Sequence, residues 1–320
     1  MTQSDIAKGL ITNPVLLKHR FARDEFLKFI RALVIRRMKK SRGDLYDTAF
    51  SPLITHIENT EGLSKAIELM KDAYNSLGKD GFVAQQLARL LYTNKRFDEA
   101  LEWAEKAKSR LPFNTFILDT VGQVYKQQFF YLFDNLKEEP TPEEGVQIIS
   151  IALQAISAFQ DSENTPNMEA GSLSVSYFGE VDVACSLLSF LSKVDVFASE
   201  GGKLQLIKYL LTDYIPETVK KPWQTFHAQL KGLQKSLENA LELISEDLCY
   251  FQTENTEEDD ELDARDPDQI YNPGEWLTEK QRVYDDFFIH KLDVSSAMAA
   301  ASLSQRPDMG SDRIPIAPKS

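Results

Sequence analysis

A 34-residue spacing of small and apolar residues constrains the fold of this chain more than any other feature of its sequence. In one half of the period, Ala66, Met70, Ala73 and Gly78 are followed 34 positions later by Ala100, Ala104, Ala107 and Pro112. In the other half, Ala84, Leu87, Ala88 and Leu91 are followed by Leu118, Val121, Gly122 and Tyr125. This period with these residue types is typical of the tetratricopeptide helix–turn–helix repeat.

The repeat predicts how the helices stack. Two helices cannot bury a continuous apolar face alone, so successive pairs must pack together, with small residues where helices approach closely. Ala88 and Gly122 take that position in the first helix of each pair, and Ala100 and Ala107 take it in the second. Pro112 ends a second helix because proline lacks the N–H group that a helix needs. We therefore predict an all-α fold with tetratricopeptide-like antiparallel helix pairs stacked as a short solenoid.

Apolar stripes, prolines and charge runs divide the 320 residues into segments. We expect a disordered N-terminus over 1–13, a basic helical segment over 14–60, the repeats over 61–163 and C-terminal helices packing on the repeats over 172–252. An acidic linker over 253–274, a terminal helix over 275–303 and a disordered tail over 304–320 follow. Within these segments, Pro222 is expected to open one long helix to Gln252, and Thr278 with Gln281 is expected to cap the terminal helix.

Composition indicates a globular protein without a membrane span. The chain is 42% hydrophobic, its mean hydropathy is −0.33, and no window holds about 18 consecutive apolar residues. The N-terminus lacks the basic and apolar regions of a secretory signal. Cys185 and Cys249 lie in apolar helical surroundings without metal-ligand spacing, which favours reduced thiols. We expect a cytoplasmic protein.

The net charge of −13 is unevenly distributed. Between Lys18 and Arg42 there are ten basic residues and two acids. Five of the basic residues form a candidate patch for RNA: Arg31, Arg36, Arg37, Lys39 and Lys40. The alternative, which we favour, is a helix end whose positive charges complement the helix dipole and neighbouring acidic helices.

No catalytic motif is present in the sequence. Gly201-Gly202-Lys203 lacks the earlier glycine and the hydroxyl of a phosphate-binding loop, and no nucleophile elbow occurs. Four histidines are scattered without the spacing of a metal site. We expect no enzymatic activity, no cofactor and no metal.

The stacked repeats instead predict a protein-interaction scaffold. Its partner would be a peptide, or another domain of a longer relative, held on the concave surface formed by the first helices. Six residues between the structural positions are the candidates for this groove: Gln85, Arg89, Tyr92, Asp119, Gln123 and Lys126. Two alternatives remain open, namely RNA binding through the basic 18–42 helix and self-association through the 222–252 helix.

Four segments, in their order and spacing, also resemble one protein family. They are HRFARDEFLKFI (His19–Ile30), DTVGQVYK (Asp119–Lys126), AFQDSE (Ala158–Glu163) and FGEVDVA (Phe178–Ala184). Residues 14–250 are thereby similar to the tetratricopeptide-bearing region of the vertebrate sterile alpha motif domain-containing protein 9 and 9-like family.

The resemblance implies a role for the chain. Members of this family are large, cytoplasmic, interferon-responsive antiviral factors and growth suppressors. They join a sterile alpha motif, an Alba-like nuclease acting on transfer RNA, a P-loop NTPase, helical repeats and an OB-fold. The chain would correspond to the repeat module, as a truncated relative or a fragment, with no catalytic residue carried over.

Overall fold

The computed structural model of the chain describes residues 50–76, 78–136, 142–165, 174–194, 202–217, 223–254 and 273–289, with the single residues 21, 197 and 219. Every regular element within these ranges is helical, which confirms the all-α prediction for the described residues. The helices are α3 (Phe50–Glu61), α4 (Leu63–Ser76), α5 (Gly81–Thr93), α6 (Phe97–Arg110), α7 (Thr115–Asp134), α8 (Pro142–Glu163), α9 (Ser174–Lys193), α11 (Gly202–Leu211), η2 (Trp223–Phe226), α12 (His227–Lys231), α13 (Leu233–Glu254) and α14 (Pro273–Phe288).

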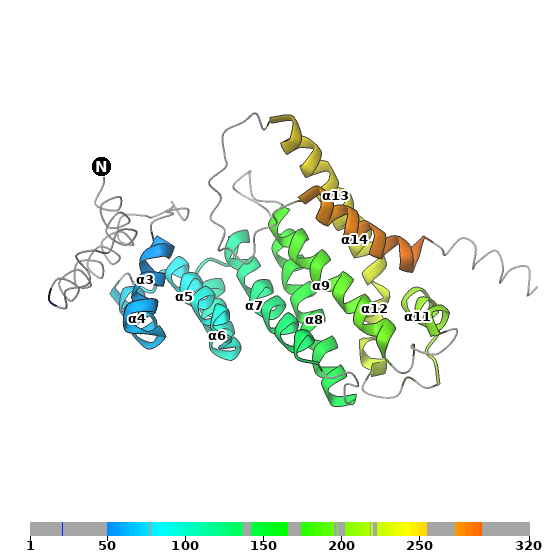
Figure 1. Cartoon of the computed structure of the whole chain (residues 1–320), viewed down its shortest axis with the longest axis horizontal. Coiled ribbons are helices and arrows are strands. Elements are labelled where there is room, and N and C mark those ends of the chain that lie inside the picture. The colour runs from blue at the N-terminus through cyan, green and yellow to red at the C-terminus, as the bar shows by residue number, and fades with distance from the viewer. Residues whose placement is uncertain are drawn as a thin grey trace, which may run out of the picture.

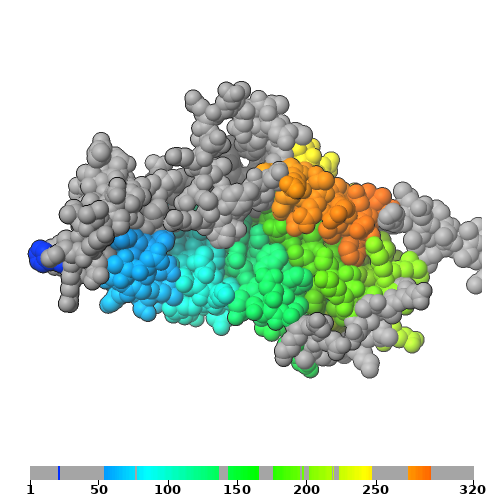
Figure 2. Space-filling view, viewed as in Figure 1, coloured from blue at the N-terminus to red at the C-terminus, as the bar shows by residue number. Residues whose placement is uncertain are grey.

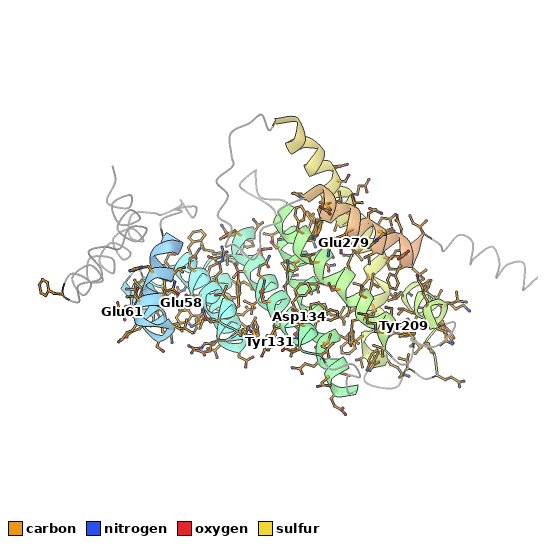
Figure 3. The ribbon with its side chains drawn as sticks, in the orientation of Figure 1. Glu58, Glu61, Tyr131, Asp134, Tyr209 and Glu279 are labelled. Carbon is orange, nitrogen blue, oxygen red and sulfur yellow. The ribbon has the colours of Figure 1, made fainter. Side chains whose placement is uncertain are left out.

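The helices follow one another along the long axis of the molecule (Figure 1). From α3 to α9 each helix packs against the next one in sequence, and α5 also packs against α7. The space-filling view shows the same order as successive bands from α3 to α9, with α14 lying over the later helices (Figure 2). Glu58 and Glu61 mark the α3 end, and Tyr209 marks the opposite end (Figure 3). This arrangement depends on contacts between helices that are near in sequence.

The 34-residue period appears in the bounds of the helices. Helix α4 begins at Leu63 and α6 at Phe97, and they end at Ser76 and Arg110, so both ends are offset by 34 residues. Helices α5 and α7 are capped alike. Asp80 accepts hydrogen bonds from the backbone of α5, and Asn114 accepts one from Ile117 at the start of α7. The small residues of the period are fully buried, as expected for close helix contacts: Ala66, Ala73, Ala84, Ala88, Ala100, Ala104 and Ala107.

Two sequence predictions about helix limits are wrong. The helix expected over 222–252 is broken at Gly232, whose N–H bonds to the carbonyls of Gln229 and Leu230, so η2 and α12 precede α13. Helix α14 begins at Pro273, so Thr278 lies inside it and donates to the carbonyl of Gly274 instead of capping the start. The predicted segments 1–13 and 304–320, and the interior of the acidic linker, lie outside the described residues.

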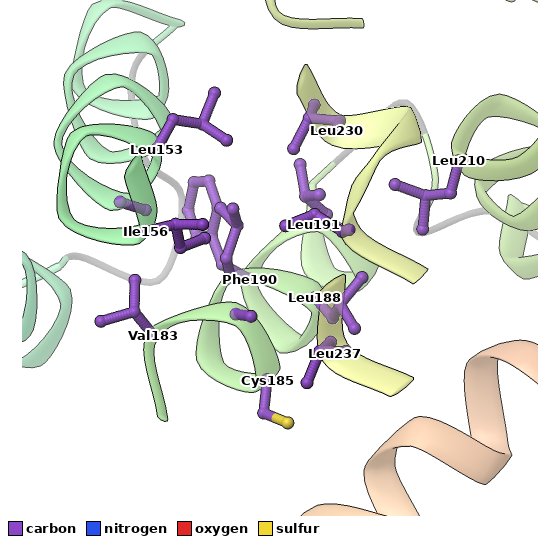
Figure 4. Packing of buried hydrophobic residues seen from close by; sticks show 14 of the residues in the cluster. Leu153, Ile156, Val183, Cys185, Leu188, Phe190, Leu191, Leu210, Leu230 and Leu237 are labelled. Carbon is purple, nitrogen blue, oxygen red and sulfur yellow. The ribbon is translucent and has the colours of Figure 1, made fainter. Parts of the chain in front are cut away.

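Buried side chains form two hydrophobic clusters that meet at α7. The first joins α3 to α7 and ends with Ile117, Val121 and Val124, whereas the second joins α7 to α14. Tyr125 packs against both clusters. Within the second cluster, side chains of α9 extend toward α8, α11, α12 and α13 (Figure 4). No helix in the described ranges combines the length and apolarity needed to cross a bilayer.

Phe159 of α8 is held between two glycines on neighbouring helices. The ring is fully buried. A Cβ atom built on Gly122 of α7 would lie 2.5 Å from Cδ1 of Phe159, and one on Gly179 of α9 would meet the same ring as closely. Any larger residue at either position would push the helices apart. The two glycines therefore set the spacing of α7, α8 and α9.

Replacing Gly122 by alanine should lower the free energy of unfolding by about 1–3 kcal/mol, because the added methyl group overpacks the Phe159 site. Denaturant unfolding followed by circular dichroism measures the change. Gly274→Ala, at an exposed position of α14, is the matched control and should change little. Combining Gly122→Ala with Phe159→Leu should cost less than the sum of the single changes. Additive losses would show that the two residues do not interact.

Candidate functional site

Three of the four segments that carry the family resemblance converge in space. Segment 119–126 lies on α7, segment 158–163 at the end of α8, and segment 178–184 on α9, and these helices pack against one another. Each segment contributes to the Phe159 contact and also supplies polar side chains beside it. Together with Ser176 of α9 and Ser236 of α13, these polar side chains form what we call the polar junction. Its members are Asp119, Gln123, Gln160, Ser162, Glu163, Ser176, Glu180 and Ser236.

One half of the polar junction links α7, α8 and α9. The hydroxyl of Ser176 donates to Oδ1 of Asp119 over 2.9 Å and lies 3.0 Å from Oγ of Ser162. Ser162 donates in turn to the backbone carbonyl of Thr115 over 2.9 Å. All three side chains are buried. Because buried polar groups must find partners within the protein, these bonds favour this one arrangement of the three helices.

The other half extends to α13. Nε2 of Gln160 donates to Oε1 of Glu180 and to Oγ of Ser236, each over 2.7 Å. Ser236 also donates to Glu180. Glu180 is buried at 2% exposure and lies next to the carboxyl of Glu163. The junction therefore joins four helices, three of which are far from α13 in sequence.

Glu163 is protonated at neutral pH. Burial is the main reason that its pKa rises to about 9, and the neighbouring carboxylates of Glu180 and Asp119 raise it further. The pKa of Glu180 is also raised by burial, although hydrogen bonds from Ser236 and Gln160 oppose this. Two carboxyl groups this close repel each other when both are ionised, so Glu163 and Glu180 share a proton.

Asp182, two residues after Glu180 on α9, is an ionised acid with several partners. Its carboxylate lies 3.0 Å from Nζ of Lys126 on α7 and 3.1 Å from Nζ of Lys280 on α14. The indole N–H of Trp276 donates to Oδ1 over 3.0 Å. Burial alone would raise the pKa of Asp182, but the two lysines outweigh it and the pKa is lowered. Asp182 thus connects α7, α9 and α14.

The predicted groove residues lie mostly inside the protein. Four of the six are buried, at 1% exposure for Gln85, 3% for Tyr92, and 7% for Asp119 and Gln123. Gln85 donates to Thr120 of α7, and Asp119 belongs to the polar junction. Arg89 and Lys126 are partly exposed. The period located these residues on α5 and α7, but it did not reveal which neighbouring helices cover them.

The other predicted patch, Arg31, Arg36, Arg37, Lys39 and Lys40, lies outside the described residues.

Sequence reasoning missed Glu180, Asp182 and Trp276. A signal was present, because Glu180 and Asp182 are the two acids of α9, and an apolar run from Val181 to Leu191 surrounds Asp182 with few other polar residues. Acids at buried helix positions require partners, and those partners come from α7, α8, α13 and α14. Their identity depends on long-range packing that no local pattern encodes.

The described residues contain no group of histidine, cysteine and acidic side chains arranged to hold a metal ion. Cys185 is buried, and burial raises the pKa of its thiol to about 12. A thiol with such a pKa is almost entirely protonated and therefore a poor nucleophile.

Comparison with known proteins identifies relatives of this chain. No protein-family model matches the chain. It is 25% identical over 286 residues to the human protein named sterile alpha motif domain-containing protein 9-like, covering 81% of this chain and 18% of that protein. The chain is related to the sterile alpha motif domain-containing protein 9 and 9-like family.

Two further relatives belong to the same family. The mouse sterile alpha motif domain-containing protein 9-like is 29% identical over 218 residues, which are 63% of this chain and 13% of the relative. The human sterile alpha motif domain-containing protein 9 is 26% identical over 166 residues, which are 51% of this chain and 10% of the relative. The chain thus spans less than a fifth of each relative, and the resemblance predicted from four sequence segments is confirmed.

The shared proton of Glu163 predicts how stability depends on pH. Folded Glu163 keeps its proton to about pH 9, whereas the unfolded residue loses it near 4.5. The free energy of unfolding should therefore fall as the pH rises between these values. Glu163→Gln should remove much of this slope and raise the free energy of unfolding at pH 8 by about 1–2 kcal/mol.

Urea unfolding at a series of pH values measures this effect. Glu143→Gln, at an exposed position on the same helix, is the control and should leave the slope as it is. A Glu163→Gln protein that is less stable at pH 8, with an unchanged slope, would show that Glu163 is ionised in the folded state.

Proposed function

We propose that this chain is a non-enzymatic scaffold built from tetratricopeptide-like helix pairs, which holds a protein or peptide partner. The observation that carries the proposal is the 34-residue offset shared by the sequence period and by both ends of α4 and α6. Repeats that stack in this way create extended surfaces, and such surfaces are used for binding.

Packing in the N-terminal half supports the repeat interpretation. The residues of the period contact neighbouring helices through fully buried alanines, and α5 packs against both α6 and α7. The pairs would be α3 with α4, α5 with α6 and α7 with α8. The polar junction and the second hydrophobic cluster would then cap the stack with α9 to α14.

The partner surface that we propose is the partly exposed part of α5 and α7. Arg89 and Lys126 are the members of the predicted groove that remain partly accessible. Lys126 already neutralises Asp182, so its replacement would disturb the fold as well as binding. Binding is tested at Arg89, which is partly exposed, and circular dichroism of the variant separates a loss of binding from a loss of fold. As the sequence resemblance implies, we place this scaffold in a cytoplasmic antiviral setting, with the partner supplied by another domain of a longer relative.

Affinity capture from the lysate of interferon-treated cells, with the full chain as bait, tests the proposal. Captured proteins should survive ribonuclease and raised salt. Arg89→Ala should reduce capture about fivefold, since a contributing interface residue is worth ~1 kcal/mol. Arg110→Ala, at an exposed position on the neighbouring helix α6, is the matched control.

Two results would contradict the scaffold function. Loss of every captured protein on ribonuclease treatment or in raised salt would assign binding to RNA, because phosphate contacts weaken steeply with salt. Equal capture by the Arg89→Ala and unmodified chains would exclude the surface around Arg89.

A further inference from the structure

Helix α14 covers one face of α9 and α13, and only part of it is buried. Its three buried residues, Tyr284, Phe287 and Phe288, lie in its second half. Near its start, the ring of Trp276 contacts that of Phe178 on α9 at a tilted angle, with 4.8 Å between the ring centroids. The phenol of Tyr284 hydrogen-bonds with Gln234 and Glu238 of α13. The opposite side of α14 is exposed to solvent.

The polar anchor beneath α14 remains satisfied when α14 is absent. Asp182 binds Lys280 and Trp276 of α14 through Oδ1, but it also binds Lys126 of α7 through Oδ2. Removing both Lys126 and Lys280 would leave the charge of Asp182 without an ion pair, which is costly. Removing α14 alone leaves the ion pair between Asp182 and Lys126 in place. Helix α14 can therefore leave the face of α9 and α13 while Asp182 keeps Lys126 as its partner.

The number of residues between α13 and α14 sets how far α14 can move from its site. Residues 255–272, between α13 and α14, number 18 and include eight acids and one arginine. A chain of that length can span up to about 60 Å when extended. A helix of 16 residues is marginally stable alone in water, so α14 depends on docking for its structure. Docking and folding of α14 are therefore linked.

We propose that the face of α9 and α13 is a helix-binding site that α14 occupies in cis, and that its ligand in trans is an amphipathic helix of a partner protein. That helix would carry an indole, a lysine one turn later, and aromatic residues two and three turns later, as Trp276, Lys280, Tyr284, Phe287 and Phe288 do in α14. This site shares Lys126, through Asp182, with the surface proposed on α5 and α7. Arg89 lies on α5 and Trp276 on α14, so Arg89→Ala and Trp276→Ala test the two proposals separately.

A partner protein suits this site better than a second copy of the chain. The tethered α14 competes at an effective concentration on the order of millimolar. A second copy offers the same helix and the same contacts, so it would displace α14 only above that concentration. A partner helix that buries more of its surface than α14 does would displace it at lower concentration. The tether thus makes α14 an autoinhibitory cap.

Cys185 reports whether α14 is docked. It is 2% exposed, it interacts electrostatically with Lys280 and Glu279 of α14, and its sulfur points away from the aliphatic cluster (Figure 4). The sequence has two cysteines, so Cys249→Ser leaves Cys185 as the one thiol. Its rate of alkylation in the full chain then measures how often α14 opens.

The experiment compares alkylation of Cys185 in four full-length proteins on the Cys249→Ser background. Trp276→Ala should raise the rate about tenfold, because it removes a hydrogen bond to a charged group. Lys280→Ala is a milder second variant, since Asp182 keeps Lys126. Arg282→Ala, exposed on the same helix, should match the parent protein, and circular dichroism confirms that each variant is folded.

A synthetic peptide of residues 273–289 is then added in trans to the Trp276→Ala protein. It should slow alkylation back toward the parent rate, whereas the same peptide with alanine at 276 and 280 should not. An unchanged rate in both folded variants, or no protection by the peptide, would overturn the proposal. A parent rate that falls with protein concentration as the mass doubles in light scattering would assign the site to a second copy, and would also overturn it.

Discussion

The packing of Phe159 against Gly122 and Gly179 is the contact on which the rest of the structure depends. It brings α7, α8 and α9 so close that no side chain fits at either glycine. At that spacing, Asp119, Ser162 and Ser176 reach one another across three helices. The same contact lies where the two hydrophobic clusters meet at α7, so the helices from α3 to α7 and the later helices are joined through it.

The polar junction and the neighbouring Asp182 hold acids in two different ways. Burial is the main influence on the pKa of Glu163 and of Glu180. The two acids share a proton, so their contribution to the stability of the fold depends on pH. Asp182 instead stays charged because lysines from α7 and α14 flank it. The first arrangement loses stability as the pH rises, whereas the second loses stability as the pH falls and Asp182 takes up a proton. Both favour one unique packing over alternatives, since their partners come from specific positions on distant helices.

Sequence reasoning succeeded where the fold is local and failed where it is not. The all-α class, the offset of α4 and α6, and the family relationship followed from the 34-residue period and four short segments. The break at Gly232 and the true start of α14 did not follow from the sequence. The local patterns after Pro222 and at Thr278 with Gln281 each fit more than one set of helix limits. Gln85 and Gln123 were assigned to a groove, since periodicity places a residue on a helix face without indicating which distant helix covers it.

Hydrogen exchange of the full chain, resolved by peptide, tests most directly whether the Phe159 contact unites the two halves. Because α7 contributes to both clusters, amides of α5 and α6 and those of α8 and α9 should open with the same free energy as global unfolding. Phe159→Ala should lower protection in both groups together. If α5 and α6 exchange at a free energy well below that of α8 and α9, and Phe159→Ala changes the latter alone, the halves are independent and the account is wrong.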